Sequence, residues 1–414
     1  MNVPKIRLAG FDGNWEKQQI GALGDTYSGL TGKSKSDFGQ GDAQYITFLN
    51  VLTNAHIDTT AFERVDVKMR ERQNVVHKGD ILFNTSSETP EEVGLCSVLM
   101  EDIDNLYLNS FCFGFRPSEN AINAEFLVYL MRSHAGRSIM KTLAQGATRY
   151  NLSKKRLCEA TILVPASEHE QQRIAEYFKN LDSLIEATTK KIETLKQTKL
   201  ACLQSMFPQP GEGKPRLRFK EYDDNWDVLP LSTFARKSTE KNTALEYNIT
   251  LTNSAEYGVI NQLDFFDHDI SNDSHIDRYY VIHNDDFVYN PRVSTFAPVG
   301  PINRNTLGYS GVMSPLYLIF KVDDINKDFL AYFFKTTLWH QYMKLEGNTG
   351  ARFDRLALSD SQFFNMPIYV PKQVKEQEDI ASFFSNLDKQ ISLYEHRLEK
   401  LTNIKSACLD GMFI

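Results

Sequence analysis

The sequence predicts an α+β fold in which two similar globular domains, each mixing α-helices and β-strands, are joined by two long helices. The two helices are expected to form an antiparallel intramolecular coiled coil, which gives the chain approximate two-fold symmetry. Three observations lead to this prediction. The second half of the 414-residue chain repeats the first. Each repeat ends in an apolar pattern of period 3.5, and the part before it mixes strand-like and helix-like segments.

The internal repeat is visible at the beginning and at the end of each half. PKIRLAGFDGNWE (4–16) is similar to PRLRFKEYDDNWD (215–227), with Pro, Arg, Asp, Asn and Trp at a shift of 211 residues. When 164–207 is compared with 370–413 at a shift of 206 residues, 19 of 44 positions are identical. Two copies of one domain, each followed by the same helix, are therefore expected.

The end of each repeat has the spacing of a coiled-coil helix. Apolar residues recur at alternating steps of four and three over more than four heptads, and burying each would stabilise the fold by roughly 1.5 to 3 kcal/mol. We therefore expect the two helices to pair with each other, the alternative being separate packing of each helix on its own domain. The predicted seam residues are Ile174, Phe178, Leu181, Ile185, Ile192 and Leu195 in the first helix and Ile380, Phe384, Leu387, Ile391, Leu398 and Leu401 in the second.

These patterns divide the chain into five segments. PQPGEGKP, which follows the first helix, contains prolines and glycines that end a helix and form an exposed connection. Within the domains, ILFN, FVYN, LYLIFKV and TILVPA are predicted strands, and FLVYLMRSHAGRSIMKTLA and DFLAYFFKTTLWHQYMKL have helical spacing. The predicted bounds are 1–164 and 215–370 for the two domains, 165–207 and 371–414 for the two helices, and 208–214 for the linker.

Composition restricts the possible classes of protein. No apolar run reaches the 18 residues typical of a membrane span and no signal-peptide pattern begins the chain, so we expect a cytoplasmic location. Five cysteines without a CxxC pair argue against disulfides and a cysteine-ligated zinc site. The net charge of −7 provides no overall attraction to nucleic acid, and neither predicted domain is basic.

Motifs for catalysis or cofactor binding are missing from the sequence. GxGxxG, GxxxxGK[ST], HExxH and GxSxG are all absent. The acidic and histidine-containing stretch from Asp264 to Asp277 has no EF-hand spacing and no counterpart in the first half, so we interpret it as a solvated loop rather than a metal site. Tyr289-Asn290-Pro291 partly matches the Asn-Pro-Pro-aromatic motif of adenine methyltransferases, but Arg292 replaces the second proline, and we interpret it as a strand end and a turn.

Three groups of polar residues are candidates for binding DNA. The loop SGLTGKSKSDFGQGDAQY offers lysines between small residues, suited to a phosphate backbone. The segments after ILFN and FVYN, TSSE and PRVST, place hydroxyl groups at matching positions, and GATRYNLS and GARFDRLALS each place arginine near an aromatic ring. The candidates are Lys33, Ser34, Lys35, Thr85, Ser86, Arg149, Tyr150, Arg292, Ser294, Thr295, Arg352, Phe353 and Arg355.

Each candidate group also has an ordinary structural interpretation. The lysine-containing loop is equally consistent with a solvated connection, and the arginines with ion pairs inside each domain. If Arg149 and Arg352 do contact bases, replacing either with alanine should weaken one half of the recognised sequence by roughly 1 to 3 kcal/mol.

The chain closely resembles the specificity subunit of type I restriction-modification systems over essentially its whole length. The resemblance rests on the two opening segments, on GATRYNLS and GARFDRLALS, and above all on P-x(4)-EQ-x(2)-IA-x(2)-F-x-NLD-x(2)-I at Pro165 and Pro371. It implies that each domain is a target recognition domain that reads one half of a bipartite DNA site. It also implies that the antiparallel coiled coil sets the spacer between the halves.

The resemblance also implies the partners and the division of chemistry. Two modification subunits would bind S-adenosylmethionine and methylate adenine, and two ATP-driven restriction subunits would complete the enzyme. This chain would then be non-catalytic and hold no cofactor, because S-adenosylmethionine, ATP and Mg belong to the partners. The rival interpretations are a coiled-coil scaffold that joins two proteins without contacting DNA and, as a weaker alternative, a methyltransferase with its own cofactor.

Overall fold

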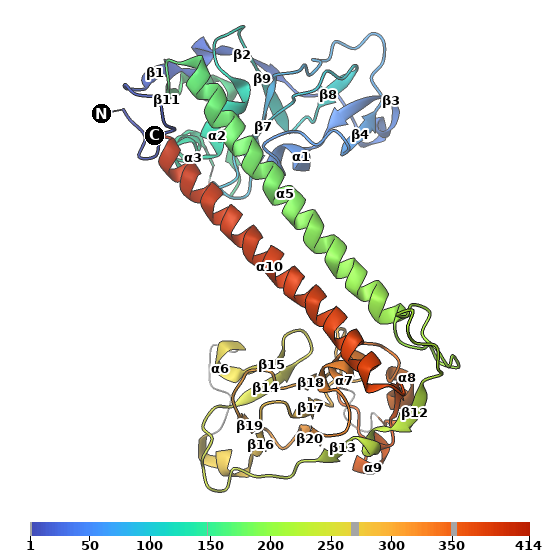
Figure 1. Cartoon of the computed structure of the whole chain (residues 1–414). Coiled ribbons are helices and arrows are strands. Elements are labelled where there is room, and N and C mark those ends of the chain that lie inside the picture. The colour runs from blue at the N-terminus through green and yellow to red at the C-terminus, as the bar shows by residue number, and fades with distance from the viewer. Residues whose placement is uncertain (1, 147, 266–272, 349–353) are drawn as a thin grey trace. The chain divides into compact units, whose positions relative to one another are not determined.

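The computed structural model describes residues 2–146, 148–265, 273–348 and 354–414. Within these residues the chain forms two compact units (Figure 1). Unit 1 consists of Met1–Thr189 with Glu395–Ile414, and unit 2 consists of Lys190–Tyr394. Each unit therefore combines one globular domain with a part of each long helix.

A four-stranded antiparallel sheet forms the centre of the domain in unit 1. Its strands are ordered β2-β9-β5-β7, and β5 is the predicted strand ILFN. All four residues of β5 are buried, because β5 lies inside the sheet between β9 and β7. The four strands are β2 (Gly24–Ser28), β9 (Cys112–Pro117), β5 (Ile81–Asn84) and β7 (Cys96–Val98).

Unit 2 repeats this sheet with the order β13-β20-β17-β18. The predicted strands FVYN and LYLIFKV supply β17 and β20, which pair antiparallel and place Phe287 opposite Phe320. The prediction of two similar domains of mixed helix and strand is thus confirmed. The four strands are β13 (Ala235–Lys237), β20 (Leu318–Val322), β17 (Phe287–Tyr289) and β18 (Ile302–Arg304).

A two-stranded ribbon connects the beginning and the end of each domain. In unit 1, β1 (Glu16–Gln19) pairs antiparallel with β11 (Thr161–Val164), and in unit 2, β12 (Asp227–Pro230) pairs with β21 (Pro367–Val370). The ribbon brings the opening segment of each repeat to the strand that leads into the long helix. The repeated NWE and NWD sequences therefore have a common structural role.

The remaining strands differ between the units. Unit 1 has a three-stranded sheet, β4-β3-β8, and a short pair, β6-β10, whereas unit 2 has the pairs β14-β15 and β16-β19. The strands are β3 (Phe38–Ile46), β4 (Phe62–Val65), β6 (Ser86–Ser87), β8 (Leu106–Leu108), β10 (Tyr150–Asn151), β14 (Leu251–Ser254), β15 (Gly258–Asn261), β16 (Tyr280–Ile282) and β19 (Gly311–Met313).

The helical pattern near the end of each domain folds as two helices rather than one. In unit 1 the break lies at Ser133, whose hydroxyl accepts a hydrogen bond from Gly136 N and thereby begins the next helix. The domain helices are α1 (Phe48–Thr53), α2 (Ala124–Arg132), α3 (His134–Leu143), α4 (Lys154–Glu159), α6 (Gln262–Phe265), α7 (Lys327–Phe333), α8 (His340–Glu346) and α9 (Asp360–Phe364), with 3₁₀ turns at Ile20–Ala22, Lys35–Asp37, Leu231–Thr233 and Asp273–Arg278.

Two long helices follow the domains, as the heptad pattern predicts. They are α5 (Glu168–Ser205), 38 residues long, and α10 (Val374–Met412), 39 residues long. Each begins three residues after the predicted start at Pro165 or Pro371; at α5, Ser167 Oγ accepts a hydrogen bond from Glu170 N, which is typical of a residue that caps a helix.

Within each unit the parts of α5 and α10 run antiparallel (Figure 1). In unit 1 the beginning of α5 shares an apolar cluster with the end of α10, and in unit 2 the end of α5 shares one with the beginning of α10. Every predicted seam residue is buried or half-buried: Ile174, Phe178, Leu181, Ile185, Ile192, Leu195, Ile380, Phe384, Leu387, Ile391, Leu398 and Leu401. The prediction of an intramolecular coiled coil is confirmed by this pairing.

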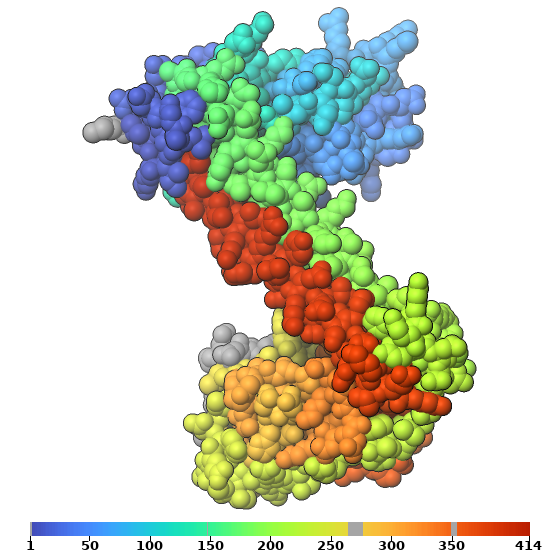
Figure 2. Space-filling view, in the orientation of Figure 1, coloured from blue at the N-terminus to red at the C-terminus, as the bar shows by residue number. Residues whose placement is uncertain are grey.

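The phenylalanine that follows each long helix joins that helix to the core of the other repeat's domain. Phe413, after α10, packs in unit 1 against Trp15 and against Phe178 of α5, with ring centroids 6.3 and 5.6 Å away. Phe207, after α5, packs in unit 2 against Trp226 and Phe384 at 5.9 and 6.3 Å. Figure 2 shows the end of α10, in red, against the blue domain of unit 1.

A buried ion pair fixes the opening segment of each repeat to its helix. Arg7 donates from Nε and Nη2 to the carboxylate of Glu170 on α5, both at 2.8 Å. Arg218 donates in the same way to Glu376 on α10, at 2.7 and 2.8 Å. These forked bonds explain why arginine recurs in PKIRL and PRLRF.

In the described part of the chain, no helix is long and apolar enough to span a bilayer.

Candidate nucleic-acid interface

In unit 2 two predicted DNA-binding segments lie side by side although they are distant in the sequence. Arg292, after β17, and Arg355, before α9, face each other as an isolated antiparallel bridge. Val293 N donates to Asp354 O and Leu356 N donates to Pro291 O, both at 2.9 Å. We call the facing residues Arg292 and Arg355 the arginine bridge.

Within the residues that the structure describes, the two guanidinium groups of the arginine bridge have no acidic partner. Among the described residues, neither side chain forms an ion pair or a hydrogen bond that would neutralise it, whereas Arg7 and Arg218 bind buried carboxylates. Like charges directly opposite each other on paired strands destabilise the pairing. Arg292 is exposed and Arg355 is half-buried, so an anion from outside the domain could reach both.

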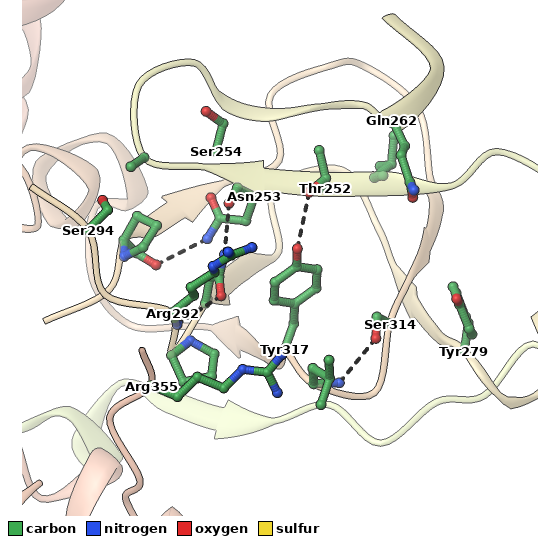
Figure 3. A pocket seen from close by; sticks show the side chains of 16 residues that line it. Thr252, Asn253, Ser254, Gln262, Tyr279, Arg292, Ser294, Ser314, Tyr317 and Arg355 are labelled. Atoms are coloured by element: carbon green, nitrogen blue, oxygen red, sulfur yellow. Dashed lines mark hydrogen bonds between the residues drawn. The ribbon is translucent and has the colours of Figure 1, made fainter. Parts of the chain in front are cut away.

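The arginine bridge borders a pocket of about 570 Å³ in unit 2 (Figure 3). Strand β14 contributes Thr252 and Asn253 to the wall, and Tyr317 lies before β20. The hydroxyls of Thr252 and Tyr317 are 3.1 Å apart. Gln262, Ser294 and Ser314 add further hydrogen-bonding groups. A cavity with arginine, amide, hydroxyl and aromatic groups matches the donors, acceptors and flat surfaces of nucleotides.

Two asparagines that line the pocket, Asn253 and Asn290, hold the segment after β17 in place. Asn253 Nδ2 donates to Val288 O at 3.0 Å, and Asn290 Nδ2 donates to Asn253 O at 3.1 Å. Asn290 Oδ1 accepts a hydrogen bond from Arg292 N at 3.0 Å. Asn290 therefore shapes the turn that presents Arg292, in agreement with the interpretation of Tyr289-Asn290-Pro291 as a strand end and a turn.

Tyr289 is also structural. Its hydroxyl donates to Val299 O at 2.9 Å, and burial raises the pKa of the phenol above its usual value. Gly300 ends the turn that follows β17. Its φ is +79°, and a Cβ there would lie 2.1 Å from Asn290 O. Gly94, at the matching position of unit 1, has φ +71°. The repeated Val-Gly pair thus marks a turn that only glycine accommodates without strain.

Unit 1 joins the corresponding segments by the same antiparallel pairing, and Leu152 N donates to Thr85 O at 2.8 Å as Leu356 N donates to Pro291 O in unit 2. The strand β6, from TSSE, pairs with β10, from GATRYNLS, so that Tyr150 lies opposite Ser87 and Asn151 opposite Ser86. Arg149 is exposed, and its Nε donates to Ser86 Oγ at 2.7 Å. Ser86 itself is buried, at 8% exposure, and so orients Arg149 from behind. Tyr150 and Thr85 are half-buried next to it.

The lysine-containing loop of unit 1 is more ordered than a solvated connection. Lys33 turns inward, where Nζ donates to Asp66 O at 2.5 Å and pairs with Glu71. Ser34 caps the short 3₁₀ turn Lys35–Asp37 through hydrogen bonds to Asp37, and these bonds lower the pKa of that carboxyl. Lys35 remains exposed. A contact of Lys33, Ser34 or Lys35 with DNA stays a prediction, and Lys35 is the one of the two lysines whose ammonium is accessible.

The other predicted contacts are distributed as follows. Ser294 and Thr295 are exposed on the same segment as Arg292. Arg352 and Phe353 lie outside the described residues, as does the middle of the acidic stretch from Asp264 to Asp277. In the part of the chain that the structure describes, no three His, Cys, Asp or Glu side chains converge as a bound metal ion would require.

Several residues of this interface were missed in the sequence. Phe111 precedes β9 and Tyr317 precedes β20, at positions 206 residues apart. Comparing the aromatic residues at matching positions of the two repeats would have identified them. Phe111 is 60% exposed, and its carbonyl accepts hydrogen bonds from Thr85 N and Oγ1 at 3.0 and 2.7 Å. Thr252, Asn253 and Gln262 have no signal in the sequence, because only the fold brings β14 beside the arginine bridge.

The sequence matches a known protein family in both of its halves. The family model for the type I restriction modification DNA specificity domain matches residues 12–197 and 223–403. The putative type I restriction enzyme MjaX specificity subunit of Methanocaldococcus jannaschii is 23% identical over 434 residues, which cover 99% of this chain and 95% of that protein. The MjaIX specificity subunit of the same organism is 25% identical over 201 residues, covering 47% of this chain and 44% of that protein.

Two solved structures have a similar fold. The S subunit of a type I restriction-modification system from M. genitalium gives a TM-score of 0.60 at 15% identity, covering 100% of this chain and 99% of that one. A chain from a structure of type I restriction-modification complex assembly gives 0.53 at 14% identity, with 95% and 96% covered. Because the family model matches both repeats and most of the chain, this protein belongs to the family of type I restriction-modification DNA specificity proteins.

Proposed function

We propose that this chain is the DNA-reading subunit of a type I restriction-modification complex, in which each unit recognises one half of a bipartite site. The arginine bridge is the observation that supports this proposal most directly. Arg292 and Arg355 face each other without an acidic partner among the described residues, at the border of a polar pocket. Such an arrangement becomes favourable when phosphates or guanine edges accept hydrogen bonds from both groups.

The pattern of the repeats supports one half-site for each unit. In unit 1 the arginine of GATRYNLS lies beside the segment that follows β5. In unit 2 an arginine of GARFDRLALS lies beside the segment that follows β17. The groups around them differ, since unit 1 presents Arg149 supported by Ser86 while unit 2 presents two arginines and Tyr317. Two similar frameworks with different recognition groups are suited to reading two different sequences.

The paired helices are proposed to set the spacer between the half-sites. An α-helix rises 1.5 Å per residue, so the 38 residues of α5 correspond to a length of about 57 Å. Both helices are continuous, and each contributes to both units. Their length is then converted into the distance between two recognised sequences.

The chain is proposed to work with partners that perform the chemistry. Two modification subunits, holding S-adenosylmethionine, would methylate adenine, and two restriction subunits, using ATP and Mg, would cleave; this chain would itself hold no cofactor and be non-catalytic. The residues 1–164 contain 18 Lys and Arg against 19 Asp and Glu, and 215–370 contain 15 against 20. Because neither domain is basic overall, the partners would supply much of the contact with phosphates.

The proposal is tested by sequencing methylated adenines in cells that express this chain with a modification subunit. We expect one bipartite motif with a fixed spacer, and we expect the Arg292→Ala, Arg355→Ala double variant to lose specificity in one half only. Mobility shifts should be strong for the chain with its modification subunit and weak for the chain alone. Failure of the assembled complex to bind any specific duplex would favour the scaffold interpretation, and tight salt-resistant binding by the chain alone would contradict the proposed role of the partners.

A further inference from the structure

Phe296 lies at the tip of a tight turn in unit 2. Ser294 N donates to Ala297 O at 3.0 Å and Ala297 N donates to Ser294 O at 3.2 Å, so Thr295 and Phe296 form the two-residue tip. We call Ser294–Ala297 the apex turn. Phe296 is 79% exposed. A bulky aromatic residue is thus presented to solvent at the point where a chain reversal holds it away from the domain.

The base of the apex turn is fixed to the domain on both sides. Ala297 and Val299 are buried at 7% and 0% exposure, and Val293 packs against the core of unit 2. Ser294 Oγ accepts a second hydrogen bond from Ala297 N at 3.1 Å. The exposure of Phe296 therefore does not result from a loosely attached loop, and a ring held in this way loses little conformational freedom on binding.

The apex turn lies directly beside the proposed DNA-binding groups. Ser294, its first residue, lines the same pocket as Arg292 and Arg355. Single exposed apolar residues are common on protein surfaces and by themselves indicate nothing. Here the exposed ring is four residues from an exposed arginine and belongs to a turn that borders the polar pocket. Cationic groups that bind phosphates next to an aromatic side chain are typical of surfaces that contact bases.

We propose that Phe296 is a wedge that stacks against a base step of the half-site read by unit 2. This inference rests on the proposed function and deepens it, because it names the group that would deform the DNA. An apolar side chain inserted at a base step partly unstacks it, which occurs at lower cost at flexible steps. Unit 2 would in this way prefer some sequences at positions where no hydrogen bond reads a base.

Comparison of the two repeats shows that the proposed wedge is specific to unit 2. The position 206 residues before Phe296 is Pro90, and exposed Glu88, Glu91 and Glu92 surround it in unit 1. A proline among carboxylates neither stacks as a phenyl ring does nor approaches phosphates favourably. The wedge is therefore expected to act at one half-site and to have no equivalent at the other.

The test uses the full chain assembled with its modification subunit, and a duplex carrying the bipartite site found by methylation sequencing. 2-Aminopurine, an adenine analogue whose fluorescence rises when it loses its stacking partner, replaces in turn each adenine on either strand of both half-sites, apart from the adenines that become methylated. With the unaltered chain we expect a several-fold rise at one step of one half-site. Phe296→Ala should remove this rise and weaken binding roughly tenfold. Phe296→Leu, which keeps an apolar wedge, should retain part of the rise.

Controls separate this proposal from the proposed function. Pro90→Ala, at the matching turn of unit 1, should leave every fluorescence signal unchanged, and circular dichroism should show that each variant is folded. If the complex binds and methylates its site but Phe296→Ala gives the same fluorescence as the unaltered chain, the wedge is refuted and the proposed function stands. If the assembled unaltered complex recognises no specific duplex, the proposed function itself fails.

Discussion

Lys199 on α5 lies 2.5 Å from Asp388 on α10, measured from Nζ to Oδ1. The same pair is formed at the repeated positions, where Lys405 Nζ lies 2.5 Å from Asp182 Oδ1. Each carboxylate also accepts a hydrogen bond at 2.8 Å from a tyrosine of the adjoining domain, Tyr332 in unit 2 and Tyr129 in unit 1. Lys199 and Lys405 continue the heptad spacing, four residues after the seam residues Leu195 and Leu401. The two Lys–Asp pairs therefore mark one alignment of the helices.

Removing a Lys–Asp pair should reduce the uniqueness of this alignment more than it reduces stability. The pair is partly exposed, with 24% for Lys199 and 42% for Asp388, so Lys199→Ala should lower the free energy of unfolding by only about 1 kcal/mol. Replacing all four residues of both pairs with Met or Leu should allow shifted alignments, because a polar seam residue selects one register of an apolar seam.

Methylation sequencing would detect shifted alignments as mixed spacer lengths in the recognised motif. The control is Lys190→Ala, which removes an exposed lysine of α5 outside the pairs. A single spacer length in the fourfold variant would show that the Lys–Asp pairs do not determine the register.

Shortening both helices by one heptad should shorten the spacer without changing either half-site. Deleting 187–193 and 393–399 removes seven residues from the stretch between Asp182 and Lys199 and from the stretch between Asp388 and Lys405, so both pairs remain. Each helix becomes about 10 Å shorter, which corresponds to roughly three base pairs of DNA. Sequencing of methylated adenines measures the spacer directly, and an unchanged spacer would refute the role of the helices as a ruler.

Changing the arginines that we propose to contact DNA should affect one half-site at a time. Arg355→Ala removes one member of the arginine bridge and should reduce discrimination in the half-site of unit 2 by roughly 1 to 3 kcal/mol if the contact is bidentate to a base. Arg149→Ala should do the same in the other half only. Competition binding of the assembled complex with duplexes altered in each half measures both effects, and an equal loss in both halves would mean that the contacts are misassigned.

Acid should weaken the attachment of the domain of unit 1 to α5. Glu125 on α2 lies 2.7 Å from His56 Nε2 and 2.9 Å from Lys179 Nζ on α5, measured from Oε1. The hydrogen bond from His56 and the interaction with Lys179 hold the pKa of Glu125 below its usual 4.5. A carboxyl with a lowered pKa in the folded state stabilises the fold above pH 4.5, and this stabilisation is lost as the pH falls through the lowered pKa.

Glu125→Gln should therefore lower the free energy of unfolding by about 1 kcal/mol at neutral pH. The difference from the unaltered chain should shrink below pH 4.5, near the usual pKa of the group. Urea unfolding between neutral and acidic pH measures this difference. Glu193→Gln, at an exposed position of α5, serves as the control, and a difference that stays constant with pH would rule out the proposed linkage.

Much of the architecture could be predicted because it depends on local periodicity and on similarity within the chain. The seam residues of α5 and α10 follow a heptad pattern, and strands β5 and β17 are short buried runs at matching places of the two repeats. The division of the apolar helical segment of each domain into two helices was harder to predict from the sequence. The apolar spacing continues through Ser133, and only its hydrogen bond to Gly136 N shows that a new helix begins there.

The sequence by itself determined the duplication, the two long helices and the family, because each of these follows from the spacing of apolar residues or from residues that recur in both halves. The tertiary structure decided which polar groups are available. Lys33 is paired inside its loop, whereas Arg292 and Arg355, 63 residues apart in the sequence, face each other across a bridge. Exposure and pairing depend on contacts between distant segments, so residue type alone does not reveal them.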